Sequence, residues 1–398
     1  MAKTAIKILI YRWKAYNQQD VENTFEKLGI DFDIYDIQPD SIESDENYRE
    51  KLALHLKNGG YHFLFSINYF PILSQACHDT GVPYVCWTCD SPLLAMYHTS
   101  VFFDTNFLFI FDRHVYEEFK QAGCSHIFYL PLAPASDRIN AIISNTTDYC
   151  YDVSFVGSLY EKNSYDPIAD KLPDYLCGYI EGALQAQTLI SGGNILPKLL
   201  TPDICEQLET ITDYRQSEDS FSDIRLLFST TVLGFKAASI SRKQFLTSLA
   251  KYLRTDGIST NGVHLFTDSG DAALPFVNFH PPVDYHAKLP KVISQSKINL
   301  NMTIPNIQTG IPLRVWDILG SGGFLLTDMR QELFEHFTPG REFDIFEDEE
   351  ELCFKTEYYL KHDDKRREMT GSAMECIKDR HSCTIRIKEL LRTLKNYI

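Results

Sequence analysis

Short apolar segments that alternate with helical ones are the feature that most constrains the fold of this chain. In the first third, the spacing of apolar residues is typical of buried strands, and helical spacing fills most of the intervals between them. Such alternation with short connections favours a parallel sheet covered by helices on both faces. The predicted strands are Ala5–Tyr11, Phe32–Ile37, Tyr61–Ile67, Pro83–Trp87, Asn106–Phe111 and Ile127–Leu132.

A second alternating unit begins with the apolar strand Asp152–Val156. Helical spacing without strands of equal strength follows, and alternation then resumes at Val263–Thr267. We therefore expect an α/β protein with two facing Rossmann-like (doubly wound) domains. The predicted parts are an N-terminal domain over 1–135, a linker over 136–150, a C-terminal domain over 151–380 with a helical insertion at about 160–253, and a C-terminal helix over 381–398.

Length and charge exclude several classes of protein. The 398 residues are too many for one core and suggest two domains, and 54 acidic against 38 basic residues give a net charge of −16. This charge argues against a nucleic-acid partner, because phosphates need a basic surface. We expect no transmembrane segment, since no apolar run approaches the roughly 18 residues required. The start of the chain lacks the pattern of a signal peptide, and the ten cysteines show no regular framework, so we expect a cytoplasmic protein with free thiols.

The stretch Lys297–Asp328 carries the clearest candidate for a binding site. It predicts a strand at Lys297–Met302, a loop, a helix over about Ile311–Leu319 and a second buried strand. A helix N-terminus that follows the carboxyl end of a strand is a natural anion site. Thr309 is expected to cap the first turn, and Gly310 to let a ligand approach the backbone. We therefore predict a phosphate-and-sugar pocket here.

Arg314 and Asp317 lie three residues apart on this helix and therefore nearly above one another. A fixed cation at Arg314 would offset the charge of a phosphate ligand, and Asp317 would accept hydrogen bonds from sugar hydroxyls. The alternative is an ordinary ion pair on a helix surface. The following Gly322 and Gly323 are better explained as a helix end and turn than as a ligand site.

Four further positions complete the candidate donor site. Gly157 and Ser158 follow the first strand of the second unit, where a doubly wound sheet receives phosphate. Tyr285 follows a strand and stacks on a nucleotide base in one interpretation, or is a core tyrosine in the other. Asn301 ends the strand before the predicted loop. The basic pair at Arg242 is more simply a solvated helix face than a phosphate contact.

In the first domain, Asp90 is the candidate group for the acceptor side. It follows an apolar strand and precedes a proline, so its carboxylate is expected at the carboxyl edge of the sheet, where it can orient or deprotonate a hydroxyl. An Asx-type turn is the alternative. Asn68, Tyr69 and His98 are weaker candidates for the same place. Cys86 and Cys89 form a CxxC without a second pair, so we expect no metal site.

Several segments of the second unit, in order and spacing, resemble the C-terminal half of GT-B glycosyltransferases, and more narrowly the family named after the spore maturation protein CgeB. They are VSFVGSLY (Val153–Tyr160), PPVDYHAKLPKVISQSKINLNM (Pro281–Met302), GIPLRVWDILGSGGFLLTD (Gly310–Asp328) and REFDIFEDEEELCFKTEYYLKHDDKRREM (Arg341–Met369). The resemblance implies transfer of a sugar from a nucleotide-diphosphate donor, with a UDP-sugar favoured, to a protein or glycan acceptor. It also implies a retaining reaction that needs neither a metal nor a cofactor.

The resemblance has one departure. Its relatives carry two glutamates seven residues apart at the donor site, and this chain has Thr309 and Asp317 at those positions. Two alternatives therefore stay open: a nucleotide-sugar epimerase or hydrolase on the same fold, and a non-catalytic nucleotide-sugar-binding scaffold subunit.

Overall fold

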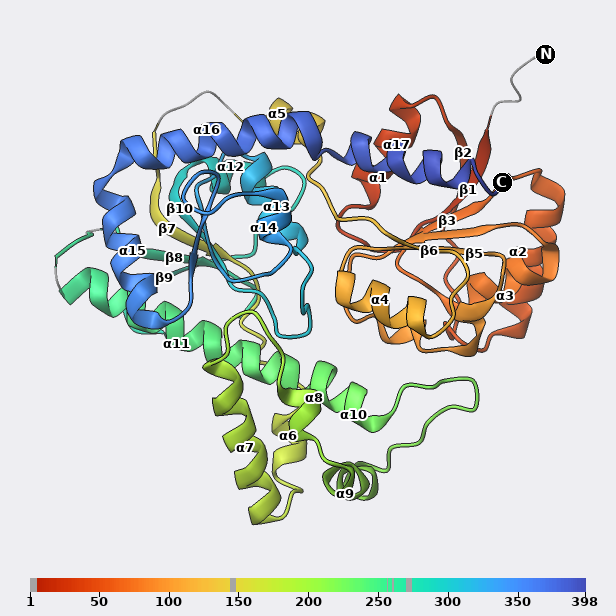
Figure 1. Ribbon diagram of the computed structural model, residues 1–398, viewed down its shortest axis with the longest axis horizontal. Coiled ribbons are helices and arrows are strands. Elements are labelled where there is room, and N and C mark those ends of the chain that lie inside the picture. The colour runs from red at the N-terminus through yellow and green to blue at the C-terminus, as the bar shows by residue number, and fades with distance from the viewer. Residues whose placement is uncertain (1–5, 144–147, 256, 260, 270–273) are drawn as a thin grey trace. The chain divides into compact units, whose positions relative to one another are not determined.

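The computed structural model describes residues 6–143, 148–255, 257–259, 261–269 and 274–398, and the chain divides into two compact units (Figure 1). The first unit comprises Met1–Ala133, Gln216–Ser222 and Ser382–Ile398, and the second comprises Pro134–Arg215 and Asp223–His381. The final helix, predicted as a separate segment, thus groups with the first unit.

The first unit is built on a six-stranded parallel sheet in the order β2-β1-β3-β4-β5-β6. The predicted strands are all present: the central ones are continuous apolar runs buried on both faces, whereas the edge strand Asp31–Tyr35 alternates between exposed and less exposed residues. The strands are β1 (Lys7–Tyr11), β2 (Asp31–Tyr35), β3 (Leu64–Ile67), β4 (Tyr84–Trp87), β5 (Asn106–Ile110) and β6 (Ile127–Tyr129). The helices are α1 (Gln18–Lys27), α2 (Glu46–Gly59), α3 (Pro71–Thr80), α4 (Arg113–Gln121) and α17 (Cys383–Leu394), with short turns η1 (Leu94–Met96) and η2 (Thr99–Phe102).

The second unit contains another six-stranded parallel sheet, in the order β12-β11-β10-β7-β8-β9. Its strand order reverses between β7 and β10, so the loops after these two strands diverge from neighbouring positions. The strands are β7 (Tyr151–Val156), β8 (Val263–Phe266), β9 (Val277–His280), β10 (Ser296–Asn301), β11 (Leu325–Asp328) and β12 (Asp344–Phe346).

Helices fill the rest of the second unit, including the predicted insertion. Those before β8 are α5 (Ser136–Ile142), α6 (Asp166–Ala169), α7 (Asp174–Thr188), α8 (Leu196–Leu199), α9 (Pro202–Thr212), α10 (Ile224–Leu227), the π-helical turn η3 (Phe228–Val232) and α11 (Leu233–Thr255). Those after it are α12 (Leu289–Ser294), α13 (Leu313–Gly320), α14 (Leu333–His336), α15 (Glu349–Lys361) and α16 (Asp363–Arg380).

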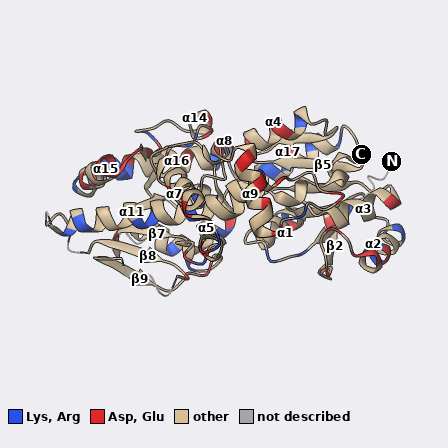
Figure 2. Ribbon diagram, turned by 90° about the horizontal axis from the view of Figure 1, so that it is seen from below, with Lys and Arg blue, Asp and Glu red and all other residues tan. Residues whose placement is uncertain are grey.

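Helix α11 links the insertion to the sheet. Its residues Leu246, Leu249 and Leu253 recur at helical spacing and pack against β7 and β8 in the main core of the unit. Burying each such side chain contributes roughly 1.5–3 kcal/mol. The insertion helices enclose a second core of their own around Leu176 and Ile180 of α7. Charges differ along the insertion: α11 carries five Lys and Arg residues and no acid, and α9 carries only acidic charges (Figure 2).

One short segment of the insertion belongs to the first unit. The backbone N–H of Thr99 donates to the Asp219 carbonyl (2.8 Å), and the N–H of Phe221 donates to the Tyr97 carbonyl (2.8 Å). The Phe221 ring also stacks on Phe102, with centroids 5.7 Å apart. Sequence spacing could not reveal this, because the segment follows helices that pack in the other unit.

Two boundaries differ from the predictions. The predicted linker over 136–150 begins with helix α5, whose single buried apolar residue, Ile139, is too little to give a periodic signal; residues 144–147 of that linker lie outside the described residues. The sequence also predicts a helix over Tyr285–Ser294, but α12 begins only at Leu289, with Pro290 in its first turn. Within the described parts of the chain, no helix combines the length and apolar character that crossing a membrane requires.

Candidate functional site

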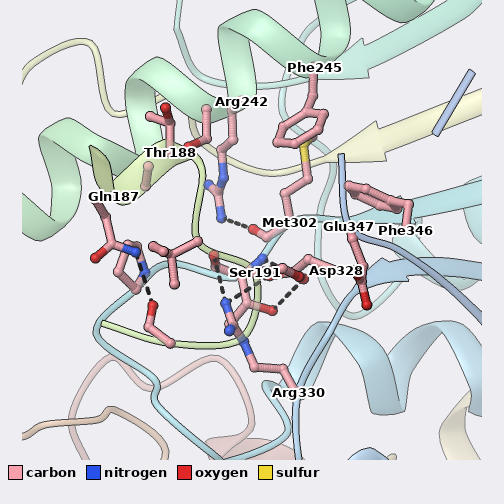
Figure 3. A pocket seen from close by; sticks show the side chains of 16 residues that line it. Gln187, Thr188, Ser191, Arg242, Phe245, Met302, Asp328, Arg330, Phe346 and Glu347 are labelled. Atoms are coloured by element: carbon pink, nitrogen blue, oxygen red, sulfur yellow. Dashed lines mark hydrogen bonds and ion pairs between the residues drawn. The ribbon is translucent and has the colours of Figure 1, made fainter. Parts of the chain in front are cut away.

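The reversal of strand order between β7 and β10 marks the place where ligands bind in open α/β sheets. One side chain, Arg242 of α11, joins the two loops that leave this point. Its Nη1 donates to the carbonyl of Ser158 after β7 (2.7 Å), and its Nη2 donates to the carbonyl of Met302 after β10 (2.6 Å; Figure 3). The guanidinium also lies 4.8 Å from the centre of the Tyr160 ring. Arg242 therefore fixes the geometry of the reversal point.

The charge of Arg242 is buried without an ion-pair partner among the described residues. Only 8% of the residue is exposed, and burial lowers the pKa of its guanidinium. The carboxylate of Asp328 is near enough to raise that pKa in part, but it lies beyond ion-pair distance of Arg242 and pairs with Arg330 at 2.7 Å; in the described parts of the chain, the Nε of Arg242 has no hydrogen-bond partner. A buried cation that is held by carbonyl oxygens and aromatic rings, without a carboxylate in contact, is costly unless an anion joins it. The arrangement therefore has the chemistry of an anion site.

This finding corrects the prediction that Arg242 lies on a solvated helix face. Arg242 precedes Leu246, Leu249 and Leu253 by four, seven and eleven residues, so it lies on the buried stripe of α11. That spacing was a usable signal in the sequence. The neighbouring Lys243 does point outward, and its Nζ pairs with Glu161 at 3.0 Å.

A cavity of about 50 Å³ lies beside Arg242 at the carboxyl ends of β10, β11 and β12 (Figure 3). It is lined by a second buried cation, Arg330, whose Nη2 donates to Asp328 (2.7 Å) and to the Thr303 carbonyl (3.2 Å). The insertion contributes the segment that contains Ser191. A polar cavity of this size suits a few water molecules or a group as small as one phosphate.

The predicted contacts at the strand ends lie around this place. A Cβ built on Gly157 would lie 3.2 Å from the Phe155 ring, a tight contact, and 3.8 Å from Nη1 of Arg242, an ordinary one, so a side chain here would crowd the Phe155 ring. Ser158 offers its carbonyl to Arg242, and its Oγ accepts from the N–H of Tyr160 (3.1 Å). Asn301 is buried, and its Nδ2 donates to Thr327 Oγ1 (3.0 Å), which ties β10 to β11. Asn301 therefore supports the loop that follows β10.

Arg314 and Asp317 of α13 form the predicted pair, with Nη1 and Oδ2 3.4 Å apart. Asp317 is 2% exposed, whereas the Arg314 side chain keeps 28% of its surface. The hydroxyl of Tyr285 donates to the other oxygen of Asp317 at 3.1 Å. Arg314 also lies close enough to Arg242 that its charge lowers the Arg242 pKa, although burial is the main cause. The two arginines thus place positive charge on adjoining parts of the second unit.

The predicted cap at Thr309 is wrong. The N-cap of α13 is Pro312, because the helix begins at Leu313 and the proline fixes the backbone before it. Thr309 instead donates through Oγ1 to Glu332 Oε1 (2.8 Å), and the Glu332 N–H donates to the Thr309 carbonyl (3.3 Å). Glu332 is 1% exposed. A carboxylate therefore lies next to Thr309, supplied by the segment after β11, where no local pattern indicated it; Gly310, beside it, is buried.

Gly322 and Gly323 follow the end of α13, as the turn interpretation predicted. Gly322 has a φ of +68°, and a Cβ on Gly323 would lie 2.5 Å from the Ile293 side chain. They serve the close packing of the turn before β11.

In the first unit, Asp90 is exposed and lies beside Asn68 at the carboxyl ends of β4 and β3. The Asn68 side-chain amide donates to Asp90 Oδ2 (2.7 Å), and its oxygen accepts from the N–H of Cys89 (2.8 Å). Tyr69 and His98 are buried and hydrogen-bond to Ser100 Oγ, each at 2.7 Å. The structure therefore joins Asn68, but neither Tyr69 nor His98, directly to Asp90.

The cysteines of the CxxC are poorly suited to redox chemistry. Burial raises the pKa of both the Cys86 and the Cys89 thiol, so neither is present as the reactive thiolate at neutral pH. Among the described residues, no group of three or more His, Cys, Asp and Glu side chains is arranged to hold a metal ion.

Comparisons with known proteins support the two-domain fold. Residues 243–392, less than half of the chain, match the model of a family described as glycosyl transferase-like. No curated protein matches the chain in sequence. HepE from Anabaena, solved in complex with UDP-glucose, is similar in structure with a TM-score of 0.53 and 10% identity over 98% of this chain and 100% of that one. The lipopolysaccharide outer core galactosyltransferase WaaB, in its apo form, has a TM-score of 0.51 and 10% identity over 99% and 100% of the two chains.

These matches define the class of fold. The two six-stranded parallel sheets with their surrounding helices form the two-domain α/β architecture of GT-B glycosyltransferases. The predicted fold class is thereby confirmed.

Proposed function

We propose that this chain is a glycosyltransferase that takes a sugar from a nucleotide-diphosphate donor, with a UDP-sugar favoured. The observation that carries the proposal is Arg242, a buried cation without a carboxylate partner among the described residues, at the strand reversal of the second sheet. A diphosphate supplies negative charge next to this buried cation. HepE, whose fold is similar, was solved with UDP-glucose, which supports the choice of donor class.

In this proposal, different residues of the second unit bind different parts of the donor. Arg242 and Arg314 hold the diphosphate and stabilise its charge as it leaves. Gly157 and Ser158 let its oxygens approach the backbone. Asp317 accepts hydrogen bonds from the ribose hydroxyls. The Thr309–Glu332 pair replaces the acid that the resemblance expects at Thr309, on the side of the sugar. Tyr285, through its hydrogen bond to Asp317, and Asn301, through its hydrogen bond to Thr327, support this set of residues.

In the first unit, we assign the acceptor to Asp90. The bond from the sugar's anomeric carbon to the diphosphate oxygen breaks, and a bond to an acceptor hydroxyl oxygen forms, with its proton passing to a base or to solvent. Asp90 is exposed and oriented by Asn68, so it can hold that hydroxyl. A protein or glycan acceptor, a retaining outcome, independence of metal and membership of the CgeB-like family follow from the resemblance and are part of the proposal.

The test is calorimetric titration with UDP and with a panel of UDP-hexoses, followed by measurement of donor hydrolysis. We expect UDP to bind and Arg314→Ala to weaken its binding by about 10-fold, as the loss of a charge-assisted hydrogen bond predicts. If no nucleotide or nucleotide sugar binds and Arg314→Ala changes nothing, the proposal fails.

One alternative has a specific observation in its favour. Thr309 stands where related enzymes carry an acid, which favours a nucleotide-sugar-binding scaffold subunit. Binding of a UDP-sugar without hydrolysis, and without transfer to any acceptor in a broad panel, would support that function over catalysis.

A further inference from the structure

We infer that Tyr285 and Arg138 are positioning residues that hold Asp317 in the orientation needed to recognise the ribose of the nucleotide. The inference rests on the proposed function, because it assigns residues to the same donor site. Neither residue belongs to α13, and Arg138 lies in the segment that the sequence predicts as a linker.

The first step is the contact between Tyr285 and Asp317. The Tyr285 hydroxyl donates to Asp317 Oδ1 at 3.1 Å, while Oδ2 lies 3.4 Å from Nη1 of Arg314. The longer distance to the cation shows that the carboxylate is not drawn fully onto Arg314. Tyr285 therefore holds one oxygen of Asp317, and the other oxygen faces Arg314, whose side chain keeps 28% of its surface exposed.

The second step is the way in which Arg138 holds Tyr285. The Arg138 guanidinium carbon lies 4.9 Å from the centre of the Tyr285 ring. Its Nη1 also donates to the carbonyls of Tyr285 (3.3 Å) and His286 (2.9 Å). One side chain thus fixes both the ring and the backbone of this turn between β9 and α12. Because the guanidinium covers the ring, the face of Tyr285 that it covers does not stack on a base.

The consequence concerns competition for Asp317. We expect a buried carboxylate that loses the hydrogen-bond donor at Oδ1 to turn toward the cation that faces its other oxygen, which here is Arg314. That movement would shorten the Arg314–Asp317 pair, withdraw the acceptor from the ribose and reduce the charge available to the diphosphate. Tyr285 and Arg138 keep the acid and the cation of α13 available to two different parts of one ligand.

The experiment compares the affinities of UDP and of 2′,3′-dideoxy-UDP, which lacks both ribose hydroxyls, in wild type, Tyr285→Phe and Arg138→Ala. We expect wild type to prefer UDP by about 10-fold, the range of a hydrogen bond to a charged group. Tyr285→Phe, which removes only the hydroxyl, should reduce this preference to about threefold or less by weakening UDP binding more than dideoxy-UDP binding. Arg138→Ala should act in the same direction, and Arg138→Lys should restore part of the preference.

The matched control is Tyr358→Phe, a partly exposed tyrosine of α15 outside the donor site, which should leave the preference unchanged. If Tyr285→Phe weakens both nucleotides equally, or leaves the preference intact, the inference is overturned while the proposed function stands. If wild type binds UDP but does not distinguish it from the dideoxy form, the ribose role of Asp317 and the inference both fail. If wild type binds neither, the proposed function itself fails.

Discussion

The two sheets of the molecule differ most at the points where their strand orders reverse. In the first unit this point lies between β1 and β3, and aromatic side chains fill it. The Trp13 indole donates to the Ile67 carbonyl at 2.7 Å, and the Phe70 ring packs edge-on against Tyr11 and Trp13. In the second unit the point lies between β7 and β10, and the group that bridges the two loops is the guanidinium of Arg242. The same position in a similar fold thus holds an apolar cluster in one unit and a cation in the other.

The cations near the two points differ in what neutralises them. Arg12 follows β1, and its Nε and Nη2 donate to the two oxygens of Glu22 at 3.0 and 2.7 Å. Arg242 donates to two carbonyl oxygens and lies over the Tyr160 ring, and in the part of the chain that the structure describes it forms no ion pair with a carboxylate. A doubly wound fold provides a place for phosphate, but the electrostatics decide whether the place is used. The difference assigns the anion site to the second unit.

The most decisive test of this comparison substitutes Arg242 and Arg12, each in a separate variant, by methionine, which has a similar length and no charge. We expect Arg242→Met to weaken UDP binding by about 100-fold, because a buried charge-assisted contact to phosphate is lost. Arg12→Met, the matched control, should change UDP affinity by less than about twofold. Calorimetric titration measures both.

Measuring the thermal stability of the variants distinguishes a loss of binding from misfolding. Removing an unpaired buried cation offsets the loss of its hydrogen bonds to two carbonyls, so we expect the thermal midpoint of Arg242→Met to stay within a few degrees of wild type. Equal losses of UDP affinity in the two variants would show that the two reversal points do not differ in function.

The sheets themselves could be predicted from the sequence because their central strands are apolar on both faces, whereas the edge strands β2 and β9 are partly exposed. The segment Asp152–Val156 reads as a buried run and forms β7 within a residue of its predicted start. Helix α13 was predicted from apolar residues at helical spacing, which are Ile311, Val315 and Ile318. The start of this helix was not predicted correctly, because Ile311 is buried but lies before the helix begins at Leu313. Apolar periodicity reports burial, and it fixes the ends of a helix only where a capping residue agrees.

The candidate site was predicted less completely. Arg314 and Asp317 were identified because both partners lie on one helix, three residues apart. Glu332 and Arg138 were not, since their partners Thr309 and Tyr285 are distant in sequence: Glu332 meets Thr309 across the loops after β11 and β10, and Arg138 reaches Tyr285 from helix α5. Arg242 was misassigned because a charged residue was taken to face solvent, although its spacing from Leu246 placed it on the buried stripe.

A smaller effect is expected on the acceptor side, at Asp90. Asp90→Asn keeps the shape of the side chain and removes the charge that can hold or deprotonate a hydroxyl. We expect transfer to slow by about 10- to 50-fold with UDP affinity unchanged, since the residue belongs to the first unit and the anion site to the second. Steady-state kinetics with a donor and an acceptor, together with UDP titration, check this. A parallel loss of UDP affinity would contradict the division of roles between the two units.

The smallest expected effect concerns acid stability, for which the second unit has a hydrogen-bonded pair of histidines. Nδ1 of His264 and Nε2 of His280 lie 2.8 Å apart, and burial lowers the pKa of both imidazoles below the ordinary value of 6.5. The unfolded chain then binds more protons than the folded one as the pH falls below 7. The stability that the pair contributes is therefore complete above about pH 6.5 and declines toward pH 5.

Replacing the pair by amides, as His264→Asn with His280→Gln, should make the free energy of unfolding less dependent on pH between 7 and 5. Urea unfolding at several pH values measures this slope. In the first unit, burial likewise lowers the pKa of His98, which is bonded to Ser100. His98→Asn should reduce the slope by less than the double substitution, because it removes one titrating group instead of two adjacent ones. An unchanged slope in the His264 and His280 variant would show that the pair is not held neutral, and that acid sensitivity does not distinguish the two units.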